Sequence, residues 1–235
     1  MEKFKKYLPI KLVIFYTLLM LFASNKVKTA GIFNVSKNAY INFQFNYQII
    51  LLIITVCALL LTYLLNKENF ITYFSFGNIS APAQELKIFG IKSNDTWLQT
   101  GLSLSLVISI ATGIFMYLQL KESLVNWTLL SSGFIWIILF SLSNSFAEEM
   151  IFRMGIVSPL KGLLSPMVIY TISAVLFGLP HFAGMPNGIV GATMAGVLGF
   201  VLAKSLYETN GFFWAWLIHF LQDVLIIGGI YLSGK

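Results

Sequence analysis

The stretch from residue 162 to residue 203 contains no Asp, Glu, Lys or Arg. A helix needs about 20 apolar residues to cross the hydrocarbon core of a bilayer, so this stretch is too long for one span. The segment "FAGMPNG" at residues 182–188 supplies a break between two spans. The whole chain is 57% hydrophobic and only 10% charged, whereas soluble domains contain about 25% charged residues. The sequence therefore predicts an integral membrane protein with no room for a sizeable soluble domain.

Other apolar runs of spanning length divide the rest of the chain. They predict about seven transmembrane helices in total, with a range of six to eight, packed as an all-α polytopic helical bundle. The expected spans are residues 9–24, 47–65, 98–120, 127–158, 164–182, 188–206 and 211–231. The basic start "MEKFKK" also suits a signal peptide, but no A-x-A cleavage site ends the first run, so a retained helix is favoured.

The net charge of +6 comes mainly from lysines that lie between the apolar runs. This arrangement fits anionic lipid headgroups, and with seven spans the lysine distribution favours a cytoplasmic N-terminus. No basic cluster with interleaved aromatic residues occurs, so no nucleic-acid partner is expected. The Lys-, Ile-, Asn- and Phe-rich composition is typical of an AT-rich bacterial genome. The predicted location is therefore a bacterial cytoplasmic membrane, crossed several times.

Six ionisable side chains fall deep inside the predicted spans. A charged group at mid-bilayer costs about 2.5–3.5 kcal/mol on insertion scales, so such groups normally face the bundle interior, pair with one another and mark function. They are Glu148, Glu149, Arg153, His181, His219 and Asp223, and the two histidines are the only ones in the chain. This set is the candidate functional site.

In the fourth span, the segment "SNSFAEEMIFR" gives its two adjacent glutamates different tasks. Glu149 and Arg153 are four residues apart with the acid first, so they are expected to pair on one helix face. Glu148 lies about 100° away around the helix, above a polar stripe, and is left free. The stripe consists of Ser141, Asn144 and Ser145. The alternative is that these charges merely form a cytoplasmic helix end.

The fifth span ends in "FGLPHF", where Pro180 precedes His181. Because proline has no backbone N–H, the helix is expected to kink or end beside the imidazole. An antiparallel hairpin turning near residues 161–166 would hold Glu148 and His181 at nearly the same depth. The alternative is that His181 is an ordinary interfacial residue.

The seventh span contains "HFLQD", which puts His219 and Asp223 four residues apart on one face. A carboxylate beside an imidazole can fix its tautomer and raise its basicity. The alternative is a mutually satisfied buried pair that only holds helices together. With moderate helix tilt, this pair reaches the depth of the other two groups, and all four can meet in one intramembrane pocket.

An acid and two imidazoles, with a second acid behind one of them, can deprotonate water and stabilise the oxyanion that it creates at a carbonyl. Amide hydrolysis is the reaction that fits this set best. No cysteine belongs to the set, and no H-E-x-x-H zinc motif occurs in the chain.

Three motifs resemble, in order, those of the CPBP family of intramembrane proteases. The family comprises CAAX proteases, including type II CAAX prenyl endopeptidases, bacteriocin-processing enzymes and abortive-infection (Abi) proteins. "EEMIFR" matches E-E-x-x-x-R, "FGLPH" matches F-x-x-x-H and "HFLQD" matches H-x-x-x-D/N. The resemblance covers roughly residues 95–230. It implies N-terminal transmembrane helices and an interfacial loop in residues 1–94, followed by a catalytic transmembrane core in residues 95–235.

The resemblance implies an endopeptidase in which Glu148 and His181 activate water. His219 and Asp223 would bind the developing oxyanion or orient the site. CAAX-cleaving members usually have asparagine at the position of Asp223. An aspartate donates a hydrogen bond only when it is protonated, so Asp223 is better suited to orienting His219 than to binding the oxyanion. The residues implied to support these four are Glu149, Arg153 and Phe177.

The same family is often labelled metalloprotease. We expect a glutamate-dependent site without metal or other cofactor. The alternative is a zinc ion held by Glu148, His181 and His219, which would form a two-histidine, one-carboxylate site with an open position.

The expected partners are a peptide or membrane-associated protein substrate and the lipid bilayer. Bacteriocin or peptide maturation, self-immunity and CAAX-type processing all fit the resemblance. Two other function classes remain: a non-catalytic membrane scaffold or immunity protein, and a proton-coupled transporter that uses Glu148 and Asp223 as a relay. The absence of a clear inverted repeat disfavours the transporter.

Overall fold

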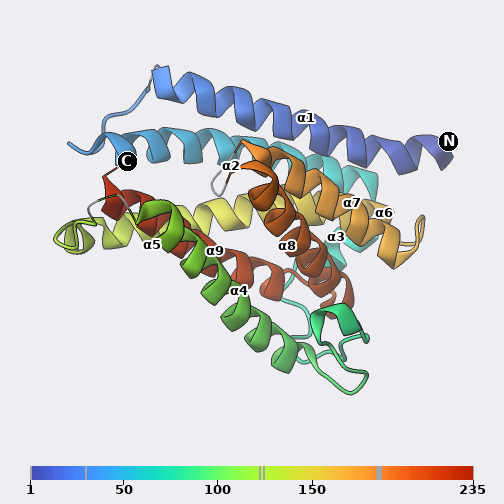
Figure 1. The fold of residues 1–235 in the computed structure, drawn as a ribbon. Helices are drawn as coiled ribbons and strands as arrows, with labels where there is room; N and C mark the ends of the chain where they lie inside the picture. Colours follow the sequence, from blue (N-terminus) through green and yellow to red (C-terminus); the bar gives the residue numbers. More distant parts are fainter. Residues whose placement is uncertain (1, 30, 122, 124, 184–186, 235) are drawn as a thin grey trace.

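The computed structural model describes residues 2–29, 31–121, 123, 125–183 and 187–234 (Figure 1). In this part of the chain the regular structure is helical and contains no β-strand. The helices are α1 (Glu2–Thr29), α2 (Ala39–Leu65), α3 (Lys67–Tyr73), α4 (Trp97–Leu120), α5 (Leu129–Glu149), α6 (Gly155–Leu160), α7 (Pro166–Gly178), α8 (Gly188–Thr209) and α9 (Phe213–Ser233).

Six helical segments among the described residues are long and apolar enough to cross a membrane. They are Tyr7–Val27, Ala39–Leu65, Trp97–Leu120, Leu129–Leu160, Gly188–Thr209 and Phe213–Ser233. A shorter apolar segment, Pro166–Phe182, stands where the fifth span is expected. The predicted class, an all-α polytopic transmembrane bundle, is confirmed.

Helix α9 packs against α4, α5 and α8. Figure 1 shows α1 and α2 side by side along one flank of the molecule, where they cover α5 and α6. Helices α7 and α8 form a tight hairpin. The three motifs therefore lie on helices that neighbour one another.

The α7–α8 hairpin is tight because small residues face each other across it. A Cβ atom on Gly178 would lie 2.7 Å from the carbonyl oxygen of Ala192, and one on Gly199 would lie 3.2 Å from the Cα of Ala174. Close backbone approach of this kind is typical of small residues between membrane helices. It holds the end of α7, with its histidine, firmly against α8.

The expected fourth span, residues 127–158, is not one regular helix. A π-helical turn, Met150–Met154, joins α5 to α6, and the backbone N–H of Gly155 reaches back to the carbonyl of Met150. The carbonyl of Phe152 accepts a hydrogen bond from the Ser173 hydroxyl of α7 at 3.5 Å. Such turns occur frequently at functional sites, and this one immediately follows the paired glutamates.

A buried ion pair attaches the connection between α3 and α4 to the end of α8. Lys204 pairs with Glu208, and both side chains are almost fully buried. Lys204 donates to the Gln84 carbonyl at 2.8 Å, while Glu208 accepts from the Gln84 N–H at 3.1 Å and from the Trp97 indole N–H at 2.9 Å. The connection is therefore a fixed part of the fold.

Replacing Trp97 by phenylalanine removes the indole donor to Glu208 and is expected to loosen this connection. A hydrogen bond to a charged group contributes about 1.5–3 kcal/mol. The rate of amide hydrogen exchange in residues 78–96 should rise by the factor that corresponds to this loss of free energy. Trp127, which is exposed, gives the matched control Trp127→Phe, and equal exchange in the two variants would contradict the expectation.

Candidate active site

Four side chains predicted from the sequence line one interior cavity of about 340 Å³. Glu148 comes from α5, His181 from the end of the α7 segment, and His219 and Asp223 from α9. Helix α8 closes another side with apolar and small residues: Gly191, Met194, Ala195 and Leu198. The size falls within the range of about 300–1,000 Å³ that is usual for ligand pockets.

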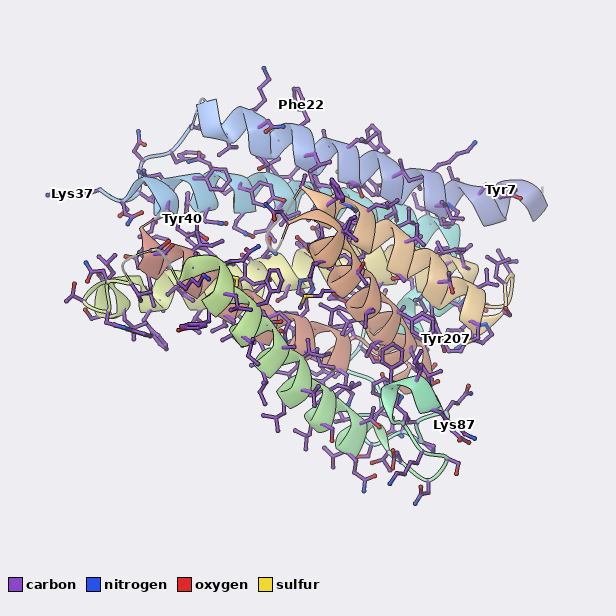
Figure 2. The ribbon with its side chains drawn as sticks, viewed as in Figure 1. Tyr7, Phe22, Lys37, Tyr40, Lys87 and Tyr207 are labelled. Carbon is purple, nitrogen blue, oxygen red and sulfur yellow. The ribbon has the colours of Figure 1, made fainter. Side chains whose placement is uncertain are left out.

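Aromatic residues of α2 form a further wall of this cavity. They are Tyr40, Phe43 and Tyr47. Tyr40 lies where the beginning of α2 meets the last turns of α9, and its ring is 6.2 Å from that of Tyr231 (Figure 2). The cavity thus combines a cluster of polar groups with largely apolar walls.

The predicted pairing of Glu149 with Arg153 is present. Arg153 Nε lies 3.1 Å from Glu149 Oε2, and both side chains are fully buried. The guanidinium of Arg153 also stacks on the ring of Phe177, 3.8 Å from its centroid. The cation is therefore held by a carboxylate on one side and an aromatic face on the other.

Glu149 holds the ring of His219, a task that the sequence assigned to Asp223. Nδ1 of His219 donates to Glu149 Oε1 at 2.7 Å, whereas Asp223 lies on the other side of the ring, 3.7 Å from Nε2. The i,i+4 spacing correctly placed Asp223 beside the imidazole. It could not reveal that a carboxylate from α5 reaches the better position.

Nε2 of His219 faces the cavity between two carboxylates. Glu148 Oε2 and Asp223 Oδ1 each lie 3.7 Å from it. In its protonated form, this nitrogen can donate a hydrogen bond into the space that a reacting carbonyl would occupy.

Asn144 joins the two cavity carboxylates. Its Nδ2 donates to Glu148 Oε1 at 3.2 Å and to Asp223 Oδ2 at 3.1 Å. Sequence reasoning placed Asn144 in the polar stripe behind Glu148 but gave it no function. Its i,i+4 spacing to Glu148 was the available signal.

His181 sits in a 3₁₀ turn, Leu179–Phe182, that ends the α7 segment as Pro180 led us to expect. Its Nδ1 is 2.8 Å from the Phe177 carbonyl oxygen. Because a carbonyl only accepts, this nitrogen carries the proton and leaves Nε2 with a free lone pair. The ring of Phe177 lies between the two histidines. Its centroid is 4.6 Å from the ring centroid of His181 and 5.5 Å from that of His219.

Among the residues that the structure describes, no group of three or more His, Cys, Asp or Glu is arranged to hold a metal ion. The zinc alternative, Glu148 with His181 and His219, places its side chains around one cavity but does not converge as a ligand set. The expectation of a site without metal stays a prediction.

A family model described as type II CAAX prenyl endopeptidase Rce1-like matches residues 130–225. Comparisons with curated proteins and with solved structures gave no match. The matched segment contains the three motifs and all four cavity groups, so the resemblance predicted from the sequence is confirmed, and it indicates a protease. Residues 130–225 of this integral membrane protein are therefore similar to the type II CAAX prenyl endopeptidase Rce1-like family.

Proposed function

We propose that this protein is an intramembrane endopeptidase that uses water activated by Glu148 and His181. The observation that carries the proposal is the convergence of four polar groups from three separate helical segments on one cavity. Ionisable groups inside a membrane bundle are costly, and their clustering marks a functional site. The similarity of residues 130–225 to a protease family supports peptide hydrolysis among the possible reactions.

In the proposed reaction, a water molecule binds between Glu148 and the free Nε2 of His181. Glu148 takes one proton while the water oxygen attacks the carbonyl carbon of the substrate peptide. The carbonyl oxygen becomes an oxyanion, which protonated His219 stabilises through its Nε2–H. Glu148 then returns its proton to the departing amine as the C–N bond breaks.

Asn144 and Glu149 prepare these groups for the reaction. The amide of Asn144 bridges Glu148 and Asp223 through its two hydrogen bonds and so fixes their positions relative to each other. Glu149, neutralised by Arg153, fixes the ring orientation of His219. Preorganised donors of this kind need no rearrangement at the moment of reaction.

The apolar walls of the cavity suit a substrate that arrives from the lipid bilayer. We place the enzyme in a bacterial cytoplasmic membrane and assign it a peptide or membrane-associated protein substrate. Bacteriocin or peptide maturation, self-immunity and CAAX-type processing are the three candidate roles. The composition favours the first two, and the family description favours the third.

Two peptides test the activity and separate these roles. Purified protein in detergent is incubated with a farnesylated peptide that ends in a CaaX sequence and with its unprenylated twin, and the products are identified by mass spectrometry. Cleavage of the farnesylated peptide alone supports CAAX processing, and cleavage of both supports a broader peptidase. If neither is cleaved, peptides that accumulate in membranes carrying the Glu148→Gln variant identify the substrate, and the absence of any accumulation contradicts a protease.

Removal of divalent metal is expected to leave the rate of cleavage unchanged. The reason is that, in the proposed reaction, water is activated by protein side chains and not by a metal ion. The measurement compares initial rates before and after dialysis against EDTA and 1,10-phenanthroline, with metal content determined on the same samples. A loss of rate that added zinc restores would contradict this expectation.

A further inference from the structure

We infer that Gln48 of α2 is a positioning residue for the proposed reaction, acting through Asn144 on the two cavity carboxylates. This inference rests on the proposed function. Gln48 lies outside the segment that matches the protease family, and it contributes no atom to the cavity wall.

Gln48 is the middle member of a continuous chain of hydrogen bonds. The Ser143 hydroxyl donates to Gln48 Oε1 at 2.8 Å, and Gln48 Nε2 donates to Asn144 Oδ1 at 3.2 Å. Asn144 Nδ2 then donates to Glu148 and Asp223. The Gln48 side chain is buried, with only 5% of the residue's surface exposed. Both ends of its amide are therefore engaged inside the bundle.

The chemistry of the groups determines which of them donates and which accepts in each hydrogen bond of this series. Ionised carboxylates accept hydrogen bonds and cannot donate, so Asn144 must turn its NH₂ group towards Glu148 and Asp223. The side-chain oxygen of Asn144 then faces Gln48, which must donate to it from its own NH₂ group. The remaining oxygen of Gln48 accepts from the Ser143 hydroxyl, which lies closer to it, at 2.8 Å, than to its other acceptor, the Phe140 carbonyl, at 3.2 Å. Each member thus dictates the orientation of the next.

A glutamine inside a spanning helix also has a plainer role, because polar side chains hold neighbouring membrane helices together. The two roles make different predictions. Helix association affects stability and would not act selectively on the catalytic step. Orientation of Asn144 affects kcat, since it decides whether the carboxylates meet donors or a carbonyl oxygen. The directional contacts favour the positioning role.

The test replaces Gln48 by methionine, which has a similar length but cannot donate or accept through an amide. With the peptide that wild-type protein cleaves, kcat should fall by about two- to tenfold while KM stays unchanged, as expected for one lost hydrogen bond in the transition-state arrangement. Thr55→Val is the matched control. Thr55 is also buried on α2, and its hydroxyl bonds only to the Leu51 carbonyl of its own helix. This control should keep the wild-type kcat.

A double-mutant cycle with Asn144→Ala shows whether Gln48 acts through the asparagine. In the Asn144→Ala background, Gln48→Met should cause no further loss of kcat. The inference is overturned if the single variant keeps its kcat or changes only in KM. It is also overturned if Gln48→Met causes its full loss of kcat again in the double variant. If Gln48→Met lowers the amount of folded protein, Ser143→Ala takes its place, because it frees the Gln48 amide to rotate without changing α2; an unchanged kcat then overturns the inference.

The proposed function has a separate control in the same assay. Cleavage by wild-type protein together with its loss in Glu148→Gln shows that the protease reaction stands, whatever Gln48 does. Equal cleavage by these two proteins would remove the proposed function itself.

Discussion

Replacement of Glu148 by glutamine is expected to abolish peptide cleavage and leave the protein folded in the membrane. Glutamine has nearly the same shape and still accepts from Asn144, but it cannot take a proton from water. General-base catalysis contributes about 10²–10⁴-fold to rate, so kcat should fall by about that factor. The measurement is the initial rate of peptide cleavage, normalised to the amount of folded protein recovered from membranes.

Glu68→Gln is the matched control, because it makes the same chemical change on an exposed residue of α3. His181→Ala should also abolish cleavage, since it removes the second partner of the attacking water. Normal cleavage by either active-site variant would contradict the mechanism. Full cellular function of Glu148→Gln would instead favour a membrane scaffold or immunity protein, and uptake into proteoliposomes driven by a pH gradient would favour a transporter.

Replacement of Arg153 by methionine is expected to have the largest effect on stability. Arg153 and Glu149 are both fully buried, so the variant leaves a carboxylate without its cation inside the bundle. Loss of one partner of a buried ion pair typically costs about 3–5 kcal/mol. The measurement is the free energy of unfolding, or the Tm, of the purified protein in detergent. Cleavage should fall as well, because Glu149 holds His219.

A second substitution separates the two consequences of Arg153→Met. The double variant Glu149→Gln with Arg153→Met has no unpaired buried charge and should recover much of the lost stability, but not kcat, since a neutral amide replaces the carboxylate that holds His219. Lys87→Met provides the control. Lys87 forms an ion pair with Glu85 in which the side chains are 89% and 44% exposed, and exposed pairs contribute about 0–1 kcal/mol. Equal destabilisation by Arg153→Met and Lys87→Met would contradict the assigned role of the buried pair.

The positions of the spanning helices could be predicted because a bilayer imposes a length and a polarity on each of them. Apart from α1 and α2, the helical segments begin and end within three residues of the expected bounds. Helix α1, Glu2–Thr29, extends beyond its expected span, residues 9–24, at both ends. The second helix begins earlier than expected, at Ala39, because the polar side chains of its first turns are satisfied within the fold. Asn46, for example, accepts from the backbone of Ile32 and Phe33.

The four polar side chains that line the cavity could be named from the sequence, but the contacts between them could not. Spacing along one helix indicated the Glu149–Arg153 pair and placed Asp223 beside His219. It could not indicate that Glu149 crosses to His219, because that contact depends on the packing of α5 against α9. The part played by Asn144 was missed for the same reason, since one of its two partners lies on α9.

The division of the chain at residue 94 stays a prediction. Residues before that point nevertheless take part in the site, since Tyr40, Phe43 and Tyr47 of α2 line the cavity. A substrate would therefore meet side chains from both halves of the sequence. The four polar groups of the cavity lie after residue 94, and part of the cavity wall lies before it.

The π-helical turn at Met150–Met154 is equivalent to a one-residue insertion in an otherwise regular helix. A residue added to or removed from a helix rotates everything beyond it by about 100° relative to what precedes it. Here such a rotation would change the direction in which Glu148 and Glu149 point relative to α6. Helix α6 leads into the hairpin that bears His181, so the glutamates would turn relative to that histidine as well. Across evolution, the spacing between these glutamates and the hairpin should therefore resist insertions and deletions, and changes in length should accumulate in the loops instead.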